Sequence, residues 1–173
     1  MAPTGPGRGT SLAADNFDAA GTPLLMRLHG IERAKRRRER ETAIAIETAS
    51  AGANLSQSEA DRFEAQLVDA PDDLALRIKL LGYYFRNQFT SEEGRRRRAA
   101  HIYWIIRHKP DAAIALTPYV RLDNDPSAYE AGKDVWLSIT RQREGPREVL
   151  ENAAWFLSGL DQNTAEELLA RVG

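Results

Sequence analysis

The sequence predicts an all-α protein built from antiparallel helical hairpins, preceded by a long N-terminal helix. Apolar residues recur three and four positions apart along most of the chain, as at Phe63 and Leu67, which is the spacing of one helix face. Short polar turns separate these segments, and no stretch shows the apolar–polar alternation of a β-strand. We therefore expect one helix to begin at Ser56 and end at Ala70, and others over about 23–49, 73–87, 94–108, 111–121, 127–143, 147–158 and 164–172.

Size and charge limit the classes of function. The chain has 173 residues, 42% of them hydrophobic, which suffices for one compact domain. Its 24 Lys and Arg residues against 25 Asp and Glu residues leave a net charge of −1, so any binding to nucleic acid or anionic lipid must be local. The absence of cysteine excludes disulfides, thiolate metal sites and cysteine nucleophiles.

The N-terminal segment differs in composition from the rest. Residues 1–22 are rich in Gly, Pro, Ala and polar residues and lack the pattern of a signal peptide, so we expect this segment to be disordered. No apolar run approaches the roughly 20 residues that span a bilayer. We accordingly expect a soluble, cytoplasmic protein with N-terminal helices over 23–70 and helical repeats over 71–173.

Capping residues predict where helices begin. Ser56 and Glu59 have capping-box spacing, in which the serine side chain accepts from a backbone amide of the first turn and the glutamate reaches back. Asp125 precedes a proline, as an N-cap often does. This assignment explains residues 123–125 better than a calcium loop, which needs glycine where Ala128 stands.

Two segments share a spacing of small and apolar residues. The first is Ile78-x-x-Leu81-Gly82-x-x-Phe85, followed by Ala99-x-x-x-Tyr103 and a terminal Pro110; the second is Val149-x-x-Asn152-Ala153-x-x-Phe156, followed by Ala165-x-x-x-Leu169. Glycine within a helix costs about 1 kcal/mol relative to alanine, so Gly82 suggests a close helix–helix contact. Both segments resemble the tetratricopeptide repeat, although Asn152 stands where the family has leucine.

The resemblance covers about residues 71–172 and implies a short right-handed α-solenoid with a concave groove for a partner peptide or helix. Carried over to this chain, it implies that the groove is lined by Lys79, Tyr83, Arg86, Asn87 and Arg147. Lys79 and Arg86 would donate to an acidic side chain or a C-terminal carboxylate, with Tyr83 as an apolar wall. They could instead be ordinary exposed residues, or the helix at 23–49 could fill the groove.

Two arginine-rich stretches form an alternative basic patch, made of Arg36, Arg37, Arg38, Arg40, Arg95, Arg96, Arg97 and Arg98. They could bind nucleic-acid phosphates or an acidic polymer. Against this, no aromatic residues are interleaved with the first stretch, and adjacent arginines in the second point around a helix, so both also fit a solvated surface. A further possibility is that the long N-terminal helix dimerises.

The sequence offers no positive evidence for catalysis. It contains no phosphate loop and no nucleophile elbow. His101 and His108 would lie about 10 Å apart along a helix, too far to share a metal ion. Trp104, Trp136 and Trp155 lie in apolar helical patterns and are expected to pack between hairpins. We expect a non-catalytic interaction scaffold or adaptor with no metal and no cofactor; the alternative is nucleic-acid or acidic-polymer binding.

Overall fold

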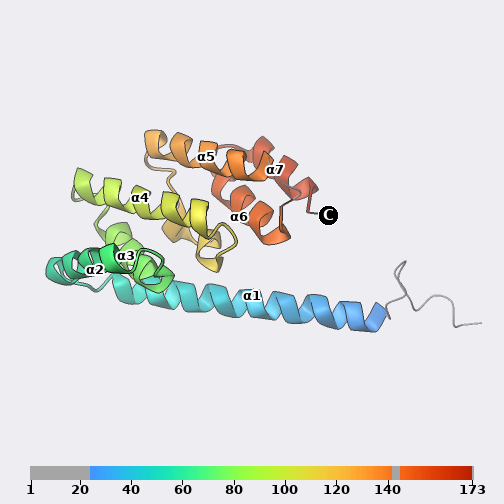
Figure 1. Cartoon of the computed structure of the whole chain (residues 1–173). Coiled ribbons are helices and arrows are strands. Elements are labelled where there is room, and N and C mark those ends of the chain that lie inside the picture. Colours follow the sequence, from blue (N-terminus) through green and yellow to red (C-terminus); the bar gives the residue numbers. More distant parts are fainter. Residues whose placement is uncertain (1–23, 142–144, 173) are drawn as a thin grey trace, which may run out of the picture. The chain divides into compact units, whose positions relative to one another are not determined.

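The computed structural model describes residues 24–141 and 145–172, and all regular secondary structure in these ranges is helical, as the sequence predicts (Figure 1). The α-helices are α1 (Leu24–Gly52), α2 (Gln57–Asp69), α3 (Leu74–Asn87), α4 (Glu92–His108), α5 (Pro126–Arg141), α6 (Arg147–Leu157) and α7 (Gln162–Ala170). None of these helices is long and apolar enough to cross a membrane. The expectation of disorder over 1–22 concerns residues outside the described ranges.

The chain divides into two units, residues 1–39 and 40–173, and the boundary lies within α1. In the first unit the described side chains of α1 are mostly exposed, and Arg36 pairs with Glu32 at 3.0 Å. In the second unit α3 lies beside α4, and α6 beside α7. Within this unit, α2 shares a buried apolar cluster with α3.

Side-chain caps place the helix starts of the second unit. The predicted capping box is present, since Ser56 N donates to Glu59 Oε2 at 2.8 Å and Glu59 N donates to Ser56 Oγ at 3.3 Å. Ser91 caps α4 by accepting from Gly94 N at 2.9 Å. The helix therefore begins two residues earlier than Gly94, where the sequence suggested a start.

The helix expected over 111–121 is wrong. Two short 3₁₀ segments take its place, η1 (Ala113–Leu116) and η2 (Pro118–Val120). Pro118 cannot donate a backbone hydrogen bond, and its ring clashes with a preceding helical turn, so an α-helix cannot run through it. Thr117, fully buried between the two segments, donates its hydroxyl to Ile114 O at 2.7 Å.

The C-terminal part of α1 crosses α3 with backbone against backbone. A Cβ added at Gly82 would overlap the carbonyl of Ala49, and one added at Gly52 would overlap the carbonyl of Lys79. The close contact that Gly82 suggested is therefore present. Its partner is the C-terminal part of α1.

A larger core joins α4, α5, α6 and α7. Trp136 is almost completely buried within it, as expected for a residue that packs between hairpins. Tyr129 stacks on Phe156 with ring centroids 5.4 Å apart. Asn152 is fully buried, and its Nδ2 donates to Pro110 O at 2.7 Å and to Ala112 O at 3.1 Å. Asn152 thereby fastens α6 to the segment after α4.

Gly82→Ala should destabilise the protein by about 3 kcal/mol, because the added methyl group forces α1 and α3 apart. Gly30→Ala is the matched control, since no atom lies within 4 Å of its Cβ position. That change should stabilise the helix by up to about 1 kcal/mol. Urea unfolding of both variants measures the difference, and equal effects would contradict the close contact.

Asn152→Leu, which introduces the residue usual in tetratricopeptide repeats, should lower the free energy of unfolding by about 2 kcal/mol, because two partly buried carbonyls lose their donor. Asn163→Leu on the exposed face of α7 serves as control and should change the free energy of unfolding by less than about 0.5 kcal/mol. A stabilised Asn152→Leu variant would show that the hydrogen bonds of Asn152 contribute little.

Candidate functional site

The predicted groove residues on α3 contact the segment between α1 and α2. Tyr83 is only 7% exposed, and its hydroxyl donates to Gln57 Oε1 at 2.6 Å. Arg86 Nη1 donates to Ala53 O at 3.0 Å and to Asn54 Oδ1 at 3.4 Å. These contacts are internal to the second unit, so this face of α3 is largely covered.

The remaining predicted groove residues also have contacts within the second unit. Lys79 Nζ lies 5.8 Å from the centroid of the Phe63 ring of α2. Asn87 Nδ2 donates to the carbonyl of Tyr83 at 2.8 Å, within the same helix. Arg147, an exposed residue at the start of α6, pairs with Glu151 at 2.7 Å. Residues 53–63 therefore pack against part of the face of α3 that the prediction assigned to the groove, and the binding role of these residues stays a prediction.

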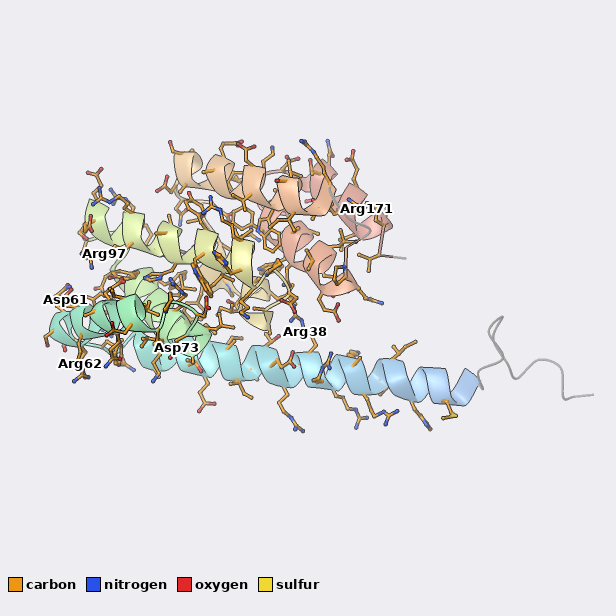
Figure 2. The ribbon with its side chains drawn as sticks, viewed as in Figure 1. Arg38, Asp61, Arg62, Asp73, Arg97 and Arg171 are labelled. Carbon is orange, nitrogen blue, oxygen red and sulfur yellow. The ribbon has the colours of Figure 1, made fainter. Side chains whose placement is uncertain are left out.

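The arginine run on α4 does not form one basic surface. Arg98 is 5% exposed, and its Nη2 donates to Tyr119 O at 3.0 Å and to Arg121 O at 2.6 Å. Arg97 lies on the side of α4 that faces α2 and α3 (Figure 2), and it pairs with Glu93 at 2.7 Å. Successive helical residues point about 100° apart, which explains why one of the four arginines is buried.

The other members of the predicted basic patch are more accessible. Arg96 also pairs with Glu93, and Arg95 Nη1 donates to Gln88 O at 3.4 Å. On α1 the side chains of Arg36, Arg37 and Arg40 are exposed, whereas Arg38 is half-buried. The structure therefore leaves an exposed basic stretch on α1 but not a continuous patch on α4.

A surface groove of about 670 Å³ lies elsewhere in the second unit. We call it the aromatic groove; it is lined by Phe85, Arg86, Gln88, Phe89, Arg98, Pro118, Arg121, Asp123, Asn124 and Trp155. Phe89 is 73% exposed and Trp155 is 37% exposed, so both rings are accessible to a ligand. Of the residues predicted from the sequence, this groove contains only Arg86 and Arg98.

Arg121 organises one side of the aromatic groove. Its guanidinium pairs with Asp123 at 2.7 Å, and its Nη1 donates to Trp155 O at 3.0 Å. The guanidinium carbon lies 5.2 Å from the centroid of the Trp155 ring. A Cβ at Gly159 would overlap this guanidinium, so a side chain there would displace Arg121 from its present position. Arg121 thus holds the partly exposed Trp155 in place. The expectation that Trp155 packs between hairpins is wrong.

Arg98 forms the floor of the aromatic groove. Burial lowers its pKa to about 10, which still leaves the guanidinium charged at neutral pH. It also lies over the Phe85 ring, 5.2 Å from the centroid. The third acceptor of its hydrogen bonds is Gln88 Oε1 at 3.2 Å. Its hydrogen-bond acceptors are therefore neutral oxygen atoms, while the negative charges of Asp123 and Asp125 act from farther away to favour the guanidinium ion.

A separate polar network joins α2, α3 and α4. Tyr84 donates its hydroxyl to Glu64 Oε1 at 2.7 Å, and His101 Nε2 lies 3.0 Å from the same oxygen. Arg77 Nη1 lies 3.3 Å from His101 Nδ1. Because arginine can only donate, Nδ1 of His101 accepts this hydrogen bond. Nε2 of His101 therefore carries the proton and donates a hydrogen bond to Glu64.

The pKa shifts agree with this direction of donation. Burial would raise the pKa of Glu64, but the hydrogen bonds from His101 and Tyr84 outweigh it and hold that pKa below its ordinary value. Burial raises the pKa of Tyr84, and its hydrogen bond to Glu64 raises it further. Both ring nitrogens of His101 are engaged, so the network is arranged to hold three helices together and leaves no free imidazole nitrogen for a substrate.

Metal binding has no support in the described residues, where no three His, Asp or Glu side chains gather as a metal site. His101 contacts Glu64, whereas His108 stacks on Trp104 with ring centroids 4.8 Å apart. Comparison of the chain with family models, with curated proteins and with solved structures found no match. The candidate site therefore rests on the geometry of the aromatic groove.

The Glu64 network should make stability depend on pH. Because the pKa of Glu64 is lower in the folded state, its contribution is present above the ordinary value of 4.5 and is lost as pH falls through the folded pKa. Glu64→Gln should therefore lower the free energy of unfolding at about pH 6 and have less effect at about pH 3. Glu130→Gln, which removes an exposed carboxylate from α5, is the control. A pH-independent loss in Glu64→Gln would contradict the assigned role.

Proposed function

We propose that this protein is a non-catalytic interaction scaffold that binds a peptide segment of a partner protein in the aromatic groove. The observation that carries the proposal is a concave surface with two accessible aromatic rings, Phe89 and Trp155. Large aromatic side chains in a concavity supply much of the binding energy at protein interfaces. A volume of about 670 Å³ is within the usual range of ligand sites.

We also propose that the helices form a short right-handed solenoid similar to tetratricopeptide repeats. The side-by-side placement of α3 with α4, and of α6 with α7, supports repeated hairpins. The proposed binding surface differs from the one that the family implies, because α2 and the end of α1 pack against α3. Function therefore follows here from the aromatic groove and not from the family's concave face.

Nucleic-acid binding is less well supported. A nucleic-acid site needs several accessible cations that track a phosphate backbone. On α4, however, Arg98 is buried, and Arg96 and Arg97 share the carboxylate of Glu93. Only the exposed stretch on α1 retains this potential.

Selection from a random peptide library with purified protein tests the proposal. Peptides enriched on the wild type should bind the double variant Phe89→Ala/Trp155→Ala at least about tenfold more weakly, because the apolar contact is lost. The double variant Val68→Ala/Leu169→Ala removes exposed apolar side chains outside the aromatic groove and should bind normally. No enriched peptide, or equal binding by all three proteins, would refute the proposal, as would binding of oligonucleotides alone.

A further inference from the structure

The charges around the aromatic groove do not balance. Three guanidinium groups line it, those of Arg86, Arg98 and Arg121, against the single carboxylate of Asp123. That carboxylate is already paired with Arg121, at 2.7 Å. The hydrogen bonds of Arg86 and Arg98 go to carbonyl and amide oxygens. These oxygens solvate a cation but carry no compensating charge.

The charge of Arg98 cannot move away from the groove. Its side chain is buried, and the carbonyls of Tyr119 in η2 and of Arg121 just after η2 hold it. Its Nε is also buried and has no hydrogen-bond partner in the described part of the chain. A fixed cation below an apolar surface is screened less than a solvated one, so its positive potential extends into the groove.

Arg86 supplies a cation that a ligand can reach. Its side chain is exposed at the edge of the groove, and its two hydrogen-bond acceptors are neutral. A carboxylate placed there would accept a charge-assisted hydrogen bond, which is about twice as strong as a neutral one. The nearby rings of Phe89 and Trp155 would bind an apolar side chain of the same ligand.

On the basis of the proposed function, we propose that the aromatic groove binds an acidic internal segment of a partner protein, in which Asp or Glu residues flank an aliphatic or aromatic side chain. The cations come from three places along the groove, on α3, on α4 and in the segment after η2. This distribution suits several side-chain carboxylates of a continuous peptide. One terminal carboxylate would engage only part of it.

The library selection described above provides the probe. Peptides displayed without a free C-terminus should be enriched in Asp or Glu beside an apolar residue. In a synthetic copy of such a peptide, replacing Asp and Glu by Asn and Gln should weaken binding by about tenfold or more. Enriched peptides that are neutral or basic would overturn the acidic segment but leave the proposed function intact, whereas no enrichment at all would refute the proposed function itself.

Two substitutions with opposite expected effects guard against misfolding as an explanation. Arg86→Gln should weaken binding of the acidic peptide by about tenfold, because it removes the accessible cation. Asp123→Asn should strengthen it, because it removes the one competing carboxylate of the groove. Arg147→Gln changes an exposed, paired arginine outside the groove and should have no effect.

The source of the carboxylate is tested separately. A second library that displays free C-termini is selected in parallel. Stronger enrichment from that library would overturn the proposal of an internal segment and show that the groove binds a terminal carboxylate. Unchanged affinity for the acidic peptide in both Arg86→Gln and Asp123→Asn would overturn the electrostatic argument. Competition by single-stranded oligonucleotides with higher affinity than the peptide would assign the groove to nucleic acid instead.

Discussion

The backbone contact between α1 and α3 determines which surface of the second unit remains accessible. Gly52 and Gly82 allow the two helices to touch, because a side chain at either position would overlap the opposite carbonyl. The chain that leaves α1 then runs beside α3, where Arg86 and Tyr83 bind Ala53 and Gln57. That side of α3 is thereby used for folding. The aromatic groove lies where α3 ends and where η2 and α6 contribute their own side chains.

Local features of the fold could be predicted from the sequence, and long-range ones could not. The capping box at Ser56 and the burial of Trp136 follow from signals within a few residues of each other. Gly82 correctly predicted a close helix–helix contact, but a glycine does not specify which backbone approaches it. The solenoid geometry was likewise inferred from spacing alone. Pro118 argues against a helix over 111–121, whereas the spacing of the apolar residues around it favours one.

The aromatic groove could not be predicted because its residues come from separate segments without a shared motif. Trp155 lies in an apolar helical pattern that is usual for buried residues, yet its ring is partly exposed over Arg121. The burial of Arg98 did leave a signal in the sequence. Arg98 lies four and seven positions before Ile102 and Ile105, both buried, so the helical period places all three on one face. The run of four adjacent arginines indicates a charged surface, although this helical period indicates burial of the fourth.

The buried polar groups give the second unit a rigid framework with an adaptable edge. Arg98 fastens α4 to the segment after η2, while Glu64 joins α2 to Tyr84 and His101. Buried polar networks of this kind restrict how helices can pack, since a shift would cost a buried charge or donor its remaining partners. The floor of the aromatic groove is therefore organised before a ligand arrives, which lowers the entropic cost of binding. Phe89 is exposed at its edge, and the exposed guanidinium of Arg86 is oriented there by Ala53 O and Asn54 Oδ1.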